Sequence, residues 1–312
     1  MQPSSDSLPA RIAALLDRLS AWASPRRERL RKWGLAGALI VFVAGLAWAI
    51  RATPELELQL GIGPLILLLL LSAPAGTVLN TIELHALSRI AGGPMSWRTS
   101  AELTVYTSAA NMLPLPGGVV TKLAGMKAHG VSYATATAVL VLSFFIWGSL
   151  AFLCASAALL ALGKATYAAI FAGVGVALLV IAAIGSTRFK RWRWIAVVVT
   201  SRATMLALEI VRYVLAVGLV GVSISFFQAA TFVVASLVGA AVVVAPQGLG
   251  VIEATTALLS SLIGLSAGIG FLAAAITRIA RLAGLALIAA GLLIVGRRPS
   301  PAPDFEDHSG LA

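Results

Sequence analysis

The sequence predicts an all-α membrane protein, a polytopic helical bundle with about six full spans and two broken, re-entrant helix pairs that form an inverted repeat. Of its 312 residues, 59% are hydrophobic and 11% are charged, whereas a soluble domain is roughly 45–50% apolar and about 25% charged. Uncharged apolar runs such as 33–50 approach the length of about 20 residues that a spanning helix needs. These features exclude a soluble enzyme, a disordered chain and a secreted disulfide scaffold.

Basic residues set the predicted orientation. The chain carries 23 Lys and Arg against 12 Asp and Glu, a net charge of +11. On a soluble chain this excess would suggest nucleic-acid binding, but here the basic residues gather at ends of apolar runs on one side of the predicted membrane, near 26–32, 89–98, 188–193 and 297–298. Cytoplasmic loops are enriched in Lys and Arg. We therefore expect a multi-pass protein of the cell inner (plasma) membrane, with both termini cytoplasmic and no nucleic-acid partner.

The chain begins with a basic cytoplasmic tail, 1–32, in which apolar residues recur at helical spacing. This pattern indicates either an amphipathic helix on the inner membrane surface or a cytoplasmic helix packed on the protein. A single transmembrane domain, 33–296, follows, and its first span is 33–50. The second span, at about 60–85, returns the chain to the cytoplasmic side, where we expect Glu83 to extend its carboxylate toward the membrane surface.

Residues 100–131 form the first broken pair. Neither of its two pieces is long or apolar enough to cross the bilayer alone. The pair is either re-entrant, entering and leaving on the cytoplasmic side, or an amphipathic hairpin on the surface. Proline and paired glycines interrupt helices, so the predicted hinge is Pro114, Pro116, Gly117 and Gly118. We expect polar residues at helical spacing in the first piece to line one side of a cavity: Glu102, Tyr106 and Asn111.

The rest of the chain adds four spans and a second broken pair. Full spans are predicted at about 133–161, 166–185, 197–221 and 268–295. Before the last span, the pieces 227–245 and 247–264 form either a re-entrant pair or two full spans. The second predicted hinge lies between them: Pro246, Gly248 and Gly250. The tail 297–312 is acidic and rich in proline, which predicts a disordered cytoplasmic segment.

The order of these segments indicates an inverted repeat. Each half, 60–161 and 197–295, reads as a span, a broken pair and a span. Three crossings separate the two pairs, so they face opposite sides of the membrane. Interrupted helices at matching positions of opposed halves are typical of transporters and mark the binding site. The alternative is a coincidence between two turns in a chain that contains 29 glycines.

A few ionisable residues remain inside the predicted membrane, where a charge costs about 2.5–3.5 kcal/mol on insertion scales. Arginine recognises phosphate through its planar fork of donors. The candidates for binding a lipid phosphate are four of the cationic residues in the spans and broken pairs: Lys122, Arg212, Arg278 and Arg281.

Two acidic residues could balance these cations. Glu253 follows the second break and serves either as a proton carrier or counter-charge, or as a first-turn cap of its helix. Glu209 lies three residues before Arg212, at a spacing that favours an ion pair on one helix. No Cys/His cluster, nucleotide-binding motif or nucleophile elbow is present, so we expect no metal site, no cofactor and no catalytic residue.

The residues around both breaks resemble the lysylphosphatidylglycerol synthase transmembrane-domain family of flippase-like integral membrane proteins. The first motif runs from Asn111 to Gly118 with Lys122, and the second is Pro246-Gln-Gly-Leu-Gly-Val-Ile-Glu253. The resemblance covers 33–296. Family members often have an acidic residue after the first glycine pair and an arginine three positions later, where this sequence has Val119 and Lys122.

The resemblance implies the movement of an anionic phospholipid or a lipid-linked group between leaflets. In the family's namesake a cytosolic aminoacyl-transferase domain follows the membrane part, whereas this sequence ends soon after its last span, so we expect a transporter and no enzyme. The alternative is a membrane enzyme, or an enzyme subunit, that acts on a lipid or polyprenyl-phosphate carrier. The expected substrate is a membrane lipid, and the candidate protein partners are a separately encoded lipid-modifying enzyme and a second copy of the chain.

Overall fold

The computed structural model describes residues 36–53, 61–111, 117–242 and 248–296. Within these ranges the chain is helical and contains no strand. An unlabelled helix, Ala36–Ala52, comes first. The labelled helices are α2 (Ile62–Ser72), α3 (Pro74–Ala91), α4 (Trp97–Ala110), α5 (Gly117–Ala128), α6 (Tyr133–Ala161), α7 (Ala165–Ser186), α8 (Trp192–Leu219), α9 (Phe226–Thr231), α10 (Val233–Ala241), α11 (Val251–Leu262) and α12 (Ala267–Gly296).

The predicted all-α membrane bundle is confirmed. By length and hydropathy, five helical stretches of the described chain could cross a membrane: Ile62–Ala91, Tyr133–Ala161, Ala165–Ser186, Trp192–Leu219 and Ala267–Ile288. Helices suit this environment because lipid offers no partner for backbone N–H and C=O groups. Large apolar side chains accordingly point outward, as on α7, where Ile170 and Ile184 are exposed. The predicted first span corresponds to the shorter apolar helix Ala36–Ala52.

Two predicted boundaries need correction. The second span continues to Ala91 instead of ending near 85, and it stops where Gly92 adopts a left-handed conformation with φ of 88°. The helix continues because its polar residues are buried against other helices instead of reaching the membrane surface. Helix α8 begins at Trp192, not at 197, directly after a turn in which Lys190 has a positive φ of 47°.

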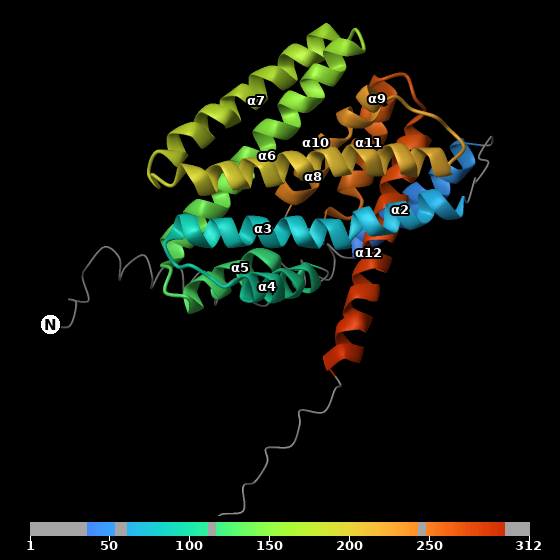
Figure 1. Ribbon diagram of the computed structural model, residues 1–312. Coiled ribbons are helices and arrows are strands. Elements are labelled where there is room, and N and C mark those ends of the chain that lie inside the picture. Colours follow the sequence, from blue (N-terminus) through green and yellow to red (C-terminus); the bar gives the residue numbers. More distant parts are fainter. Residues whose placement is uncertain (1–35, 54–60, 112–116, 243–247, 297–312) are drawn as a thin grey trace, which may run out of the picture.

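The first broken pair is two short antiparallel helices. Helices α4 and α5 pack against each other beneath α3 (Figure 1). The side chain of Asn111 links them, because its Oδ1 accepts a hydrogen bond from the backbone N–H of Gly118 at 3.0 Å. Pro114 and Pro116 lie outside the described residues.

The second broken pair is more divided than predicted. Its first piece forms two helices, α9 and α10, that meet at Phe232, and its second piece is α11. A capping box starts α9, in which Ser225 and Gln228 exchange hydrogen bonds between side chain and backbone. Pro246 lies outside the described residues.

The two largest apolar cores join most helices of the bundle, and α6 and α8 contribute to both. One core combines α3, α5 and the first parts of α6 and α8. The other combines α9, α10, α11 and α12 with the later parts of α6 and α8. In Figure 1, α3 and α8 run side by side and α12 crosses α8, consistent with their contacts. Helix α8 therefore spans the length of the bundle and contacts the polar residues of both cores.

Candidate functional site

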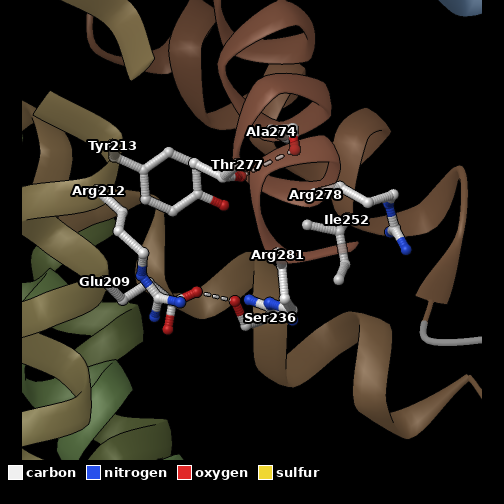
Figure 2. Close-up of a pocket in the computed structure, with 9 residues that line it drawn as sticks. All are labelled: Glu209, Arg212, Tyr213, Ser236, Ile252, Ala274, Thr277, Arg278 and Arg281. Atoms are coloured by element: carbon white, nitrogen blue, oxygen red, sulfur yellow. Dashed lines mark hydrogen bonds between the residues drawn. The ribbon is translucent and has the colours of Figure 1, made fainter. Parts of the chain in front are cut away.

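A small polar cavity lies among α8, α10, α11 and α12, inside the second apolar core. Its volume is about 20 Å³. This is near the least that one water molecule needs, roughly 10–15 Å³, and far below the roughly 300–1,000 Å³ of ordinary ligand pockets. Three of the four predicted phosphate-binding residues line this cavity: Arg212, Arg278 and Arg281. The full lining, drawn in Figure 2, consists of Glu209, Arg212, Tyr213, Ser236, Ile252, Ala274, Thr277, Arg278 and Arg281.

Helix α8 supplies Glu209 and Arg212 to this cavity, and both are buried. The predicted ion pair between them is wrong, because none is present between these described side chains. Glu209 instead accepts a hydrogen bond from the hydroxyl of Ser236 on α10. The Nε of Arg212 is buried and has no hydrogen-bond partner among the described residues. The sequence spacing alone could not anticipate that α10 would supply the partner of Glu209.

On α12, Arg278 forms the central ion pair of the site. Its Nε lies 2.5 Å from Oε1 of Glu253, whose side chain is fully buried, while only 11% of the Arg278 side chain is exposed. The other carboxylate oxygen of Glu253 accepts a hydrogen bond from the backbone N–H of Gly250 at 2.8 Å. Glu253 therefore caps α11 and neutralises Arg278 at the same time.

The charges around the cavity do not balance. Arg212, Arg278 and Arg281 contribute three positive charges, and Glu209 and Glu253 contribute two negative ones, which leaves one positive charge in excess. Figure 2 shows the guanidinium of Arg278 pointing away from the other two arginines. The excess charge therefore belongs to Arg212 and Arg281, and among the described residues Glu209 is the one acidic residue of the cavity lining.

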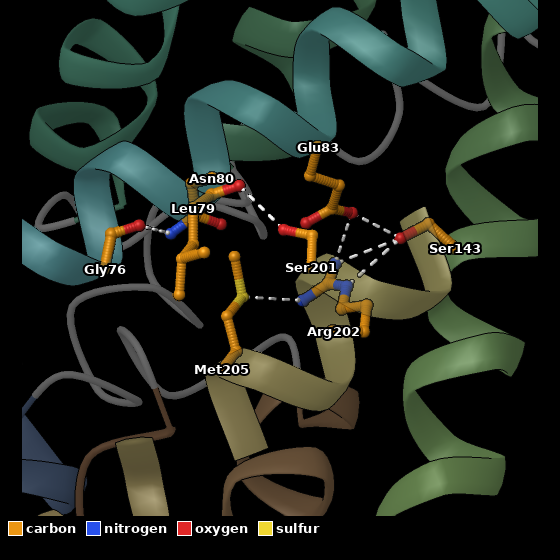
Figure 3. Close-up of polar contacts among 8 residues, drawn as sticks. All are labelled: Gly76, Leu79, Asn80, Glu83, Ser143, Ser201, Arg202 and Met205. Atoms are coloured by element: carbon orange, nitrogen blue, oxygen red, sulfur yellow. Dashed lines mark hydrogen bonds and ion pairs between the residues drawn. The ribbon is translucent and has the colours of Figure 1, made fainter. Parts of the chain in front are cut away.

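A second polar cluster lies in the first apolar core, and sequence reasoning missed its main cation. Nη2 of Arg202 on α8 lies 2.7 Å from Oε1 of Glu83 on α3, whose side chain is 1% exposed. The hydroxyl of Ser143 on α6 donates to the same carboxylate oxygen and accepts from Arg202 (Figure 3). Arg202 also stacks over the ring of Trp147, 5.2 Å from its centroid. The expectation that Glu83 reaches the membrane surface is wrong, because α8 offers it a buried partner.

Lys122 belongs to this second cluster and does not line the cavity. It lies close enough to Glu83 and Arg202 to interact electrostatically with both. The four predicted phosphate-binding cations are thus divided between two places. Arg202 and Arg212 lie ten residues apart on α8, which is about 15 Å along its axis at 1.5 Å per residue.

The glycines of both breaks allow close backbone contacts. Gly248 has a φ of 66° and Gly250 a φ of 80°, a region that glycine enters without strain. A Cβ on Gly248 would also lie 2.6 Å from the backbone Cα of Gly239 on α10. Gly117 starts α5, and a Cβ on Gly118 would overlap the amide of Asn111. These contacts hold the start of α5 and the residues before α11 against neighbouring segments.

Three residues expected to line a cavity do not do so. Glu102 is exposed and pairs with Arg98 on its own helix, with Nε and Oε1 2.9 Å apart. The side chain of Tyr106 is 67% exposed. Asn111 is exposed and accepts the hydrogen bond from Gly118 described above. These polar side chains face outward because the inner face of α4 packs on α3 and α5.

A comparison with known protein families supports the resemblance that the residues around the two breaks suggested. The family described as "Lysylphosphatidylglycerol synthase TM region" matches residues 34–289, which include every residue of both polar clusters. No curated protein and no solved structure is matched. The match covers both broken pairs and all the predicted charged site residues.

Proposed function

The chain belongs to the lysylphosphatidylglycerol synthase TM-region family, and on this basis we propose that it moves an anionic phospholipid or a lipid-linked group between the two leaflets. Membership makes it an integral membrane protein of lipid metabolism or transport, and the proposal specifies transport. The same proposal includes an inner-membrane location with both termini in the cytoplasm, which the basic clusters support.

The observation that carries the proposal is the excess positive charge in the cavity. A charge inside a membrane is expensive and is retained where it has a partner or a function. The cavity lining sets one acidic residue, Glu209, against Arg212 and Arg281. The guanidinium fork matches phosphate well. A lipid phosphate would therefore supply the missing negative charge while the acyl chains stay in the bilayer.

The small volume of the cavity means that this conformation is closed to a headgroup. Binding would need α8 to separate from α10, α11 and α12. The glycines before α11 are the natural hinge, because Gly248 and Gly250 have conformations that other residues adopt only with strain. In an inverted repeat, the first break would be a second hinge on the opposite side of the membrane. The two polar clusters lie apart along α8, which supports that arrangement.

Energy for this movement would not come from a nucleotide bound by this chain, since its sequence has no nucleotide-binding motif. Transport would be passive or coupled to an ion. Glu253 is the proposed coupling carboxylate, because it is fully buried and changes of its charge would release Arg278. Lys122 and Arg202 would offer the lipid phosphate a second cationic contact as it moves between the leaflets.

The test is lipid exchange in proteoliposomes that contain a fluorescent anionic phospholipid, with a membrane-impermeant quencher added outside. The double variant Arg212→Gln/Arg281→Gln should slow exchange at least tenfold relative to the wild type. Arg98→Gln is the matched control, because its side chain is exposed and outside both clusters. Equal rates for the wild type and the double variant would refute the proposal. A lipid modification that disappears from cells on deletion, with leaflet exchange unchanged, would favour the enzyme-subunit alternative instead.

A further inference from the structure

The cavity contains a buried donor, Nε of Arg212, that lacks a hydrogen-bond partner within the described part of the chain even when no lipid headgroup is considered. Arg212 is only 9% exposed, and its Nε has no hydrogen-bond partner among the described residues. An unpaired buried N–H costs about 1–3 kcal/mol, and more when the group is charged. Arg212 lines the cavity from α8, and Arg281 lines it from α12 (Figure 2). Two guanidinium groups therefore converge on a space that a headgroup cannot enter.

We propose that the closed cavity binds a small monoatomic anion, for which chloride is the physiological candidate. One negative charge would cancel the excess of one positive charge that Arg212 and Arg281 leave over Glu209. A neutral water molecule could accept a hydrogen bond from Nε of Arg212, but it would leave the charge uncompensated in a low-dielectric interior. The inference shares the cavity of the proposed function, but anion binding does not require that lipid transport occurs.

The size of the cavity selects this class of ligand. About 20 Å³ is enough for one water-sized particle. A halide is slightly larger than water and has no fixed geometry, so it suits two converging guanidinium groups. Phosphate and sulfate have a central atom with four oxygens and do not fit unless the helices separate. The apolar side chains of Ile252 and Ala274 complete the lining.

Other polar groups of the lining are already engaged with protein atoms. The hydroxyl of Thr277 donates to the backbone carbonyl of Ala274 at 2.8 Å. The hydroxyl of Ser236 donates to Glu209. The hydroxyl of Tyr213 lies 3.5 Å from the hydroxyl of Thr256. The remaining donors of the lining belong to the arginines, which are the groups that hold an anion best. The bound anion would then keep Arg212 and Arg281 together until a headgroup phosphate replaces it.

The first test measures the thermal stability of the purified, detergent-solubilised protein in sodium chloride and in sodium gluconate at equal ionic strength. Chloride should raise the Tm in a saturable way, as expected for a ligand that binds the folded state. Arg281→Gln should lose most of this shift, whereas Arg98→Gln should keep it. No difference between chloride and gluconate, or an equal shift in all three proteins, would overturn the proposal. So would a larger shift with sodium phosphate, because the closed cavity excludes that ion.

The second test locates the anion in the wild-type protein and does not depend on variants. Crystals grown in sodium bromide should show an anomalous peak between the guanidinium groups of Arg212 and Arg281. Bromide peaks only at the surface would overturn the inference. Failure of lipid exchange with a bromide peak in the cavity would refute transport and leave the anion site standing, so the two proposals are distinguishable.

Discussion

Replacing Arg202 by methionine removes the cation from the buried cluster of the first core and keeps much of the apolar bulk of its side chain. The change breaks the 2.7 Å ion pair with Glu83 and leaves a carboxylate whose side chain is 1% exposed. Removing one partner of a buried pair costs about 3–5 kcal/mol, because the other charge stays in a low-dielectric site. Nearby Lys122 would compensate in part, while loss of the Trp147 contact would add about 0.5–1 kcal/mol. We expect a total loss of about 3–4 kcal/mol.

The assay is unfolding in mixed micelles of dodecyl maltoside and SDS, followed by tryptophan fluorescence. Arg98→Met is the matched control, because its ion pair with Glu102 is exposed and such pairs contribute about 0.2–1 kcal/mol. The double variant Glu83→Met/Arg202→Met should regain most of the loss, since apolar pairs often replace buried ion pairs without cost. The reasoning is refuted if Arg202→Met loses no more than Arg98→Met, or if the double variant is less stable than Arg202→Met alone.

Four further changes test the site and its packing in the same unfolding assay. Glu253→Gln keeps an acceptor oxygen for the cap of α11 but removes the charge facing Arg278, so we expect a loss of about 2–4 kcal/mol, and an unchanged midpoint would contradict the buried pair. Gly270→Ala would place a Cβ 2.6 Å from a backbone carbonyl of α11 and should cost about 1–3 kcal/mol. Gly173→Ala on α7 has open space and should be neutral or stabilising by up to about 1 kcal/mol, so equal losses at the two positions would argue against close packing of α11 on α12. Gly248→Ala combines a positive φ with close backbone contact and should cost at least as much as Gly270→Ala; a neutral result would show that this segment adapts freely.

The lengths of the apolar runs predicted most helices correctly, because a membrane-spanning helix depends mainly on the apolar residues within its own segment. Apolar length gave α6 and α7 to within one residue of their observed ends. Helix α3 was predicted too short because polarity was taken as a sign of the membrane surface. A buried Glu83 is stable only with a partner on another helix, and hydropathy along one helix does not reveal such a partner.

The charged residues show the same limit at the site. Sequence reasoning selected Arg212, Arg278 and Arg281 because they are ionisable residues in apolar spans, and the structure brings all three to one cavity. Arg202 meets the same criterion within its span and was overlooked, so an inventory of every ionisable residue at membrane depth could have found it.

The sequence by itself determined that this is a multi-helix membrane protein of one family, because apolar run length, basic flanks and the motifs at the breaks are properties of the chain alone. Only the tertiary structure decided the partners: Arg202 for Glu83, Ser236 for Glu209 and Arg278 for Glu253. These contacts join helices far apart in the sequence, and their energies depend on burial that packing creates. The same packing leaves one positive charge uncompensated in a closed cavity, and that charge is the physical basis of both proposals.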